Sequence, residues 1–195
     1  DWSSDVCSSD LVHRVGSQRC ITGWSDSDWA GDRTGRKSVD CVVVELLGSV
    51  IYTSTKGQTV LAQSSAEAEL GGVHRCALTC IGVQNLWREL RQENLPVTIF
   101  TDSSAAQALA NRLGRGKIRH LEIKQLYIQH LITSNRLTVR KCRGEHNKAD
   151  YGTKPLSGKS LEKFYDWLMI ARTNKLHEVN AFGVGKPKQI GKAHV

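Results

Sequence analysis

Long apolar runs are missing from this sequence. No stretch approaches the roughly 18 to 20 consecutive apolar residues of a membrane-spanning helix. The first residues also lack the basic and apolar regions of a secretory signal peptide. We therefore expect a soluble protein that remains inside the cell and does not bind a membrane.

Closely paired cysteines, which mark small disulfide-bonded secreted domains, are missing as well. The six cysteines are scattered through expected strands and helices, so we expect mostly reduced thiols. Cys76 and Cys80 lie one helical turn apart and Cys142 closely precedes His146, a spacing compatible with zinc. No CxxC pattern accompanies them, so the sequence does not favour a zinc site.

The composition is that of one globular domain with tails: 39% hydrophobic and 24% charged residues in a chain of 195. The formal net charge is +8, although residues 1–11 contain three aspartates and no base. A basic body around acidic positions suits a polyanionic partner held beside a metal site. A basic surface that serves only solubility is the alternative.

The two ends of the chain differ from its middle. The opening segment DWSSDVCSSDL lacks periodicity and resembles the in-frame translation of a short-read sequencing adapter. We interpret residues 1–11 as an adapter artefact or a disordered leader, and residues 12–170 as the folded domain. Residues 171–195 contain Gly and Lys without a motif, and we expect a flexible basic tail.

Hydrophobic periodicity predicts an α/β fold with a mixed five-stranded sheet flanked by helices. Three strands in succession indicate an antiparallel start, and the alternation of helices and strands that follows adds two parallel strands. The expected strands span residues 21–28, 40–47, 49–55, 97–101 and 137–142. The expected helices span residues 64–92, 103–113, 120–134 and 157–170.

The longest predicted helix, residues 64–92, has an apolar face and an N-terminal cap at Ser64 or Ser65. Ser103 or Ser104 would cap the next helix in the same way. Gly71 and Gly72 cost about 1 kcal/mol each relative to Ala in a helix. The predicted apolar face consists of Ala66, Leu70, Val73, Ala77, Ile81, Trp87 and Leu90.

Four carboxylates fall at strand ends or early in a helix: Asp26 in SDSDW, Glu69 in SSAEAEL, Asp102 in IFTDSS and Asp150 in HNKAD. In an open α/β sheet such positions converge on one edge. Carboxylates brought together repel one another unless cations bind among them. Mg²⁺ suits such a group because it prefers oxygen ligands.

Spacing alone leaves alternatives at each of these positions. Asp26 and Asp28 would face the same side of a strand, and Glu67 is as well placed as Glu69. Asp102 before two serines is also typical of a turn or cap. Asp150 would equally serve as the cap of the following turn.

The chain from about residue 23 to residue 156 resembles the ribonuclease H domain at the end of the Pol polyprotein of Ty1/copia-type retrotransposons. Five stretches carry the resemblance in the family's order: SDSDWAGDRTGRKS, SSAEAEL, TDSSAAQAL, GKIRHLEIKQLYIQ and NKADYGTKPL. The resemblance implies the ribonuclease H-like fold. It assigns Asp26, Glu69, Asp102 and Asp150 as the metal-binding carboxylates, in preference to Asp28 and Glu67.

The resemblance also implies an activity: hydrolysis of the RNA strand of RNA–DNA hybrids with two Mg²⁺ ions, or Mn²⁺ in their place. Asp26 would bridge the ions, Glu69 and Asp102 would flank it, and Asp150 would help to hold the ion on the attacking-water side. His146 would shuttle protons, or it is a surface histidine beside Glu145. The implied partner is the reverse transcriptase portion of the same polyprotein, in the cytoplasm, a virus-like particle or the nucleus.

Two basic runs are candidates for contacts with the nucleic-acid backbone, with solvated surfaces as the alternative. Backbone contacts give salt-dependent binding with weak sequence preference. The first run contains Arg115, Lys117, Arg119 and Lys124, and the second contains Arg136, Arg140, Lys141 and Arg143.

Two rival functions remain open. One is a degenerate, catalytically inactive fragment of the polyprotein that binds nucleic acid, because a fold does not guarantee an activity. The presence of all four carboxylates argues against it. The other is an integrase core on a related scaffold, in which the Glu is expected last. Here Glu69 comes second among the four carboxylates, which favours ribonuclease H.

Overall fold

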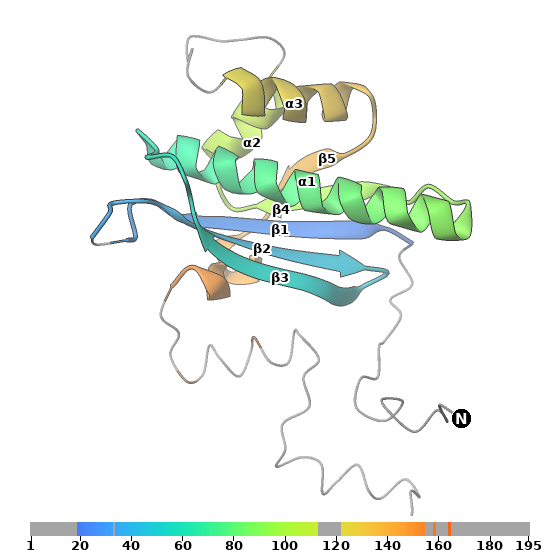
Figure 1. The fold of residues 1–195 in the computed structure, drawn as a ribbon, viewed down its shortest axis with the longest axis horizontal. Helices are drawn as coiled ribbons and strands as arrows, with labels where there is room; N and C mark the ends of the chain where they lie inside the picture. The colour runs from blue at the N-terminus through green and yellow to red at the C-terminus, as the bar shows by residue number, and fades with distance from the viewer. Residues whose placement is uncertain (1–18, 33, 113–121, 155–157, 159–163, 165–195) are drawn as a thin grey trace, which may run out of the picture.

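The structure, a computed structural model, describes residues 19–32, 34–112, 122–154, 158 and 164. Its centre is one five-stranded sheet with the strand order β3-β2-β1-β4-β5 (Figure 1). β1 pairs antiparallel with β2 and β2 with β3, whereas β4 runs parallel to both β1 and β5. The strands are β1 (Ile21–Asp28), β2 (Val39–Leu46), β3 (Ser49–Gly57), β4 (Val97–Thr101) and β5 (Thr138–Lys141).

The helices cover one face of this sheet in two layers (Figure 1). α1 (Ser65–Arg91) lies across β1, β2 and β4, and α2 (Ser104–Asn111) contacts β4 and β5. α3 (Glu122–Thr133) packs on α1 and α2. Two short 3-10 helices, η2 (Gly144–His146) and η3 (Asp150–Gly152), follow β5, and η3 contacts β1 and β2.

The predicted mixed sheet is confirmed, with every strand within two residues of its expected bounds. The three predicted helices that fall within the described residues are also present. The sequence did not indicate η2 and η3, because each is a single turn without periodicity. Most of the predicted helix at 157–170, the segment 1–11 and the tail 171–195 lie outside the described residues. No described helix is long and apolar enough to cross a membrane.

α1 buries most of its predicted apolar face against the sheet. Leu70, Val73, Ala77 and Ile81 lie in the main core. The prediction is wrong for Leu90, which is 70% exposed, because the last turns of α1 run beyond the edge of the packed layer. Trp87 is half-buried, and its indole N–H donates to Glu93.

Both predicted caps are present and each choice of serine is resolved. The side chain of Ser64 accepts a hydrogen bond from the backbone N–H of Glu67 at the start of α1. Ser103 does the same for Ala106 at the start of α2. These bonds satisfy N–H groups that have no partner inside the helix. They also fix where each helix begins, immediately beside the carboxylates.

A glycine lets the beginning of α1 approach β1 closely. A Cβ at Gly72 would lie 2.7 Å from the hydroxyl oxygens of both Ser25 and Ser27. Glycine at position 72 therefore lowers the helix propensity of α1, but it permits the close contact between α1 and β1. Gly82 lies farther along the same helix, and a Cβ added there would meet no neighbouring element within 4 Å among the described residues.

We predict opposite effects of the same substitution at these two glycines. Gly72→Ala should lower the free energy of unfolding by about 1–3 kcal/mol, because the new methyl group overpacks the contact between α1 and β1. Gly82→Ala should raise it by roughly 0.5–1 kcal/mol, because Ala favours the helix and meets no neighbour. Urea denaturation of both variants measures the difference. Equal stabilisation by both substitutions would contradict the close contact at Gly72.

Candidate metal centre

The site forms where β4 ends beside β1. The parallel register of these strands runs as far as the pair Ser25 and Thr101. Asp26 and Asp102 are the next residues on the two chains, so they come to the same edge of the sheet. β1 continues to Asp28 while β4 has ended, which leaves a gap beside Asp26. Ligands bind at such strand ends in open α/β sheets.

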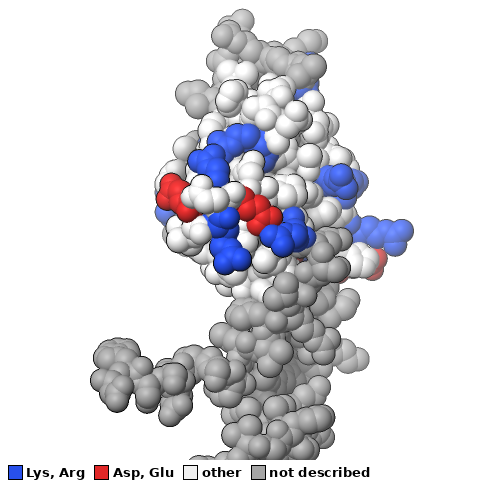
Figure 2. Space-filling view, turned by 90° about the vertical axis from the view of Figure 1, so that its right-hand side faces the viewer, with Lys and Arg blue, Asp and Glu red and all other residues white. Residues whose placement is uncertain are grey.

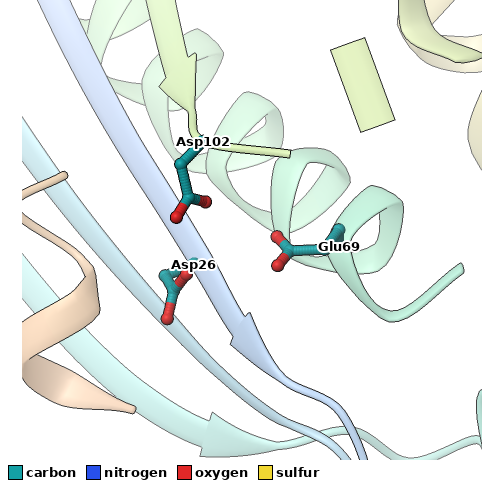
Figure 3. A group of neighbouring side chains, drawn as sticks. All are labelled: Asp26, Glu69 and Asp102. Carbon is teal, nitrogen blue, oxygen red and sulfur yellow. The ribbon is translucent and has the colours of Figure 1, made fainter. Parts of the chain in front are cut away.

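Glu69 reaches this gap from the first turns of α1. Figure 3 shows the side chains of Asp26, Glu69 and Asp102 pointing toward one another from β1, α1 and the end of β4. One ligand oxygen from each lies within 4.8 Å of the others. Asp26 is 3% exposed, and the other two carboxylates are half-buried. The predicted convergence therefore occurs for three of the four carboxylates.

These carboxylates are held in an unfavourable electrostatic environment. Burial, with Asp26 and Asp102 nearby, raises the pKa of Glu69 to about 8. Burial also raises the pKa of Asp26, although a hydrogen bond from Thr153 opposes that shift. The Oε2 atom of Glu69 is buried and has no hydrogen-bond partner among the described residues. A buried acceptor in this state is costly and is satisfied by a donor or a cation.

Two residues outside the predicted set hold two of these side chains. The hydroxyl of Thr153 donates to Asp26. The amide of Asn147 donates to the backbone oxygen of Ser25 at 3.0 Å and to Asp102 at 3.4 Å. Asn147 and Thr153 both fall in the block NKADYGTKPL, so the sequence points to their segment but does not single out these two residues.

Asp150 lies near this group but is not one of its three members. Its carboxylate pairs with Lys154, one turn further along the chain. Asp150 still raises the pKa of Asp26, and Lys154 lowers it, so both act on the site electrostatically. The assignment of Asp150 as a metal ligand stays a prediction.

The structure separates the remaining candidates. His146 in η2 is exposed, and its Nδ1 lies 3.7 Å from Oε1 of Glu145. Its role as a proton shuttle stays a prediction.

The two basic runs are placed only in part. Lys124 lies at the start of α3, while Arg115, Lys117 and Arg119 lie outside the described residues. In the second basic run, Arg136 donates to Gln84 and Asn85, Lys141 donates to Ser104, and Arg143 lies near Glu145. Arg140 is exposed on β5.

Geometry brings Asp26 and Glu69 into the carboxylate group and leaves Asp28 and Glu67 outside it. Glu67 accepts a hydrogen bond from the backbone N–H of Gln63, so it stabilises the start of α1. Asp28 is not part of the carboxylate group. Cys76 and Cys80 are buried with their sulfur atoms 4.0 Å apart, and no third metal ligand joins them in the described chain.

Three oxygen ligands on three rigid elements are suited to a hard divalent cation such as Mg²⁺ or Mn²⁺. Such an ion would offset the burial and the carboxylate repulsion that raise the pKa of Glu69, and it would give the Oε2 atom a partner. The donor set, its geometry and its electrostatics therefore all fit the predicted cation.

Curated proteins similar in sequence are retrovirus-related Pol polyproteins. The chain is 28% identical over 161 residues to the retrovirus-related Pol polyprotein from transposon RE1 of Arabidopsis thaliana. This alignment covers 82% of the chain and 11% of the relative. The chain is 30% identical over 153 residues to that of transposon RE2 from the same plant, covering 77% of the chain and 10% of the relative. The chain thus spans about a tenth of the length of the curated relatives it matches. No protein-family model matches it.

Solved structures with the same fold include ribonucleases H. LC11-RNase H1, isolated from compost, matches with a TM-score of 0.53 at 19% identity, covering 74% of this chain and 99% of that one. The same enzyme in complex with an RNA/DNA hybrid matches with a TM-score of 0.52 at 18% identity, covering 72% and 99%. This chain therefore has the ribonuclease H-like fold, and in sequence it resembles the ribonuclease H domain of copia-type Pol polyproteins, as its five motifs imply.

Proposed function

We propose that this domain is a Mg²⁺-dependent endonuclease that hydrolyses the RNA strand of RNA–DNA hybrids during retrotransposon reverse transcription. The observation that carries the proposal is the group of Asp26, Glu69 and Asp102, with its ligand oxygens within 4.8 Å and the unpartnered Oε2 of Glu69. The likeness to LC11-RNase H1, whose complex contains an RNA/DNA hybrid, supports the choice of substrate.

Asp26, Glu69 and Asp102 would hold two Mg²⁺ ions, with Mn²⁺ as the alternative and with Asp150 as a further ligand. When bound, such ions activate a water for attack on a phosphodiester and stabilise the charge that develops on the phosphate and the departing oxygen. Asp26 would be central to this set, because it groups with Glu69 and Asp102 and its pKa is also raised by the charge of Asp150.

The chain's own residues would keep this group in a fixed arrangement. Thr153 and Asn147 hold Asp26 and Asp102, so neither side chain needs to reorient when substrate binds. Lys154 keeps a positive charge near Asp26 and Asp150. His146, exposed in the turn before Asp150, would carry a proton between the site and solvent.

The partner of this domain would be the reverse transcriptase portion of the same polyprotein, because the relatives in sequence are about ten times longer than the aligned region. The domain would then act inside the cell, in the cytoplasm, a virus-like particle or the nucleus. An inactive copy that only binds nucleic acid is the competing proposal, and cleavage of a hybrid decides between them.

Hybrid cleavage tests the proposed activity directly. We expect the 195-residue chain to cut the RNA strand of an end-labelled RNA–DNA hybrid in Mg²⁺ and to leave single-stranded RNA intact. Asp102→Asn should lower the rate at least about 100-fold, because it removes a charged ligand from the metal centre. Asp28→Asn is the matched control and should retain the rate, since Asp28 is outside the carboxylate group.

Failure to cut, by a folded sample that binds hybrids, would favour the inactive copy. Equal loss of activity in both aspartate variants would point to a general effect of charge on substrate binding.

The raised pKa of Glu69 predicts a dependence of stability on pH and Mg²⁺. The pKa of Glu69 in the folded protein, about 8, exceeds its ordinary value of 4.5. The protonated carboxyl group therefore contributes its full stabilisation of the folded state below pH 4.5. It is lost as the pH rises toward 8, with a slope of at most ~1.4 kcal/mol per pH unit for one carboxyl group. Mg²⁺ should restore stability at the upper end of this range, because it binds the ionised form.

Urea denaturation between about pH 4 and pH 9, in EDTA and in Mg²⁺, measures both effects. Glu69→Gln should flatten the pH dependence in EDTA and weaken the response to Mg²⁺. A variant with the pH dependence of the unsubstituted protein would show that Glu69 does not titrate in this range.

A further inference from the structure

The ammonium group of Lys154 acts on all four carboxylates that the sequence assigns to the metal centre. It forms an ion pair with Asp150. Burial raises the pKa of Asp26 and of Glu69, and the charge of Lys154 opposes both shifts. The pKa of the ammonium group is itself raised, first by its hydrogen bond to Asp150 and also by the charges of Asp26 and Asp102. A positive charge that belongs to the chain therefore lies beside the carboxylates that would attract divalent ions.

The backbone that carries Lys154 is held in place, whereas its side chain has room to move. η3 contacts β1 and β2, and the hydroxyl of Thr55 donates to the backbone oxygen of Gly152 at 3.1 Å. The next residue, Thr153, donates to Asp26. The side chain of Lys154 is 54% exposed. Because lysine has a flexible four-carbon stem, its ammonium group is able to leave Asp150 for solvent while the backbone stays fixed.

Asp150 is engaged by this ion pair and not by the group of three carboxylates. The ligand oxygens of Asp26, Glu69 and Asp102 lie within 4.8 Å of one another, and Asp150 is outside that group. A carboxylate bonded to an ammonium group is a poor ligand for a divalent cation, because two positive charges held close together repel. Asp150 therefore binds either Lys154 or an ion at full strength, but not both.

We propose that Lys154 competes with a divalent cation for Asp150 and so sets the affinity of the second ion position. The proposal rests on the proposed function, since it concerns a residue of the same site. The group of three carboxylates forms the tighter position. The weaker position becomes complete only when Lys154 releases Asp150. Lys154 is thus a positioning residue, which acts through Asp150.

An ion pair with only a structural role would give a different result. Asp150 and Lys154 lie four residues apart and both side chains are partly exposed. Such pairs add little to the stability of a fold. Removing Lys154 should therefore change the urea midpoint only slightly. Competition for Asp150 predicts that the same substitution changes the affinity for ions, a property that a structural role leaves untouched.

A distant basic residue provides the control for the loss of charge. Figure 2 shows Lys and Arg side chains gathered, with acidic ones among them, on the end of the molecule where α1 finishes. Arg88 lies in the last turn of α1 and is exposed. Its separation from Glu69 in the sequence corresponds to roughly 29 Å along the helix. Replacing Arg88 lowers the net charge as much as replacing Lys154, but at a distance where salt screens the effect.

The test is calorimetric titration of the full chain with Mn²⁺, and separately with Mg²⁺, without nucleic acid. Lys154→Gln should tighten the weaker position about 10-fold and the tighter one by less than about threefold, because only the weaker position includes Asp150. Lys154→Arg keeps the positive charge and should restore the weak binding. Arg88→Gln should change both affinities by less than about twofold.

An unchanged weaker position in Lys154→Gln would overturn the proposal, as would equal tightening by Arg88→Gln. A second position that is measurable only in Lys154→Gln would support it, whereas a single position in every variant would overturn it. Hybrid cleavage separates this role from the proposed function. Ion binding that depends on Lys154 in a protein that does not cut would sink the nuclease alone. Cutting by a protein whose ion binding ignores Lys154 would sink this role alone.

Discussion

The mutual repulsion of three carboxylates at one corner of the sheet is the constraint on which the rest of this structure depends. Asp26 and Asp102 are adjacent because of the β1–β4 register, and α1 adds Glu69 beside them. Each would be better solvated on an open surface, and the pKa of Glu69, raised to about 8, expresses that cost. Without positive charge beside it such a group costs stability, and a bound cation would offset that cost.

Holding Glu69 in this corner requires α1 to lie unusually close to β1. Gly72 removes the side chain that would separate the two elements, and Ser27 and Gln58 both donate to the backbone oxygen of Ala68, next to Glu69. Asp40 lies within hydrogen-bonding distance of the same two side chains, with the one hydroxyl proton of Ser27 shared between the two acceptors, and so ties β2 into this contact. The beginning of α1 is thus held from β1, from β2 and from the residue that follows β3. Precise placement of a ligand depends on such support, because a charged side chain that is free to move loses much of its effect on a bound group.

The strands, the helices in the described chain and the caps could be predicted because each depends on local pattern, such as β-branched runs, 3.6-residue periodicity and serine before a helix. The convergence of Asp26 and Asp102 followed from the same reasoning, since adjacent parallel strands end on one edge. Thr153, Asn147 and Asp40 could not be found in this way. Their roles depend on contacts between residues far apart in sequence, such as Thr153 with Asp26. Leu90 was predicted to be buried and is exposed. Periodicity identifies the apolar face of a helix, but it does not show how far along the helix other elements cover that face.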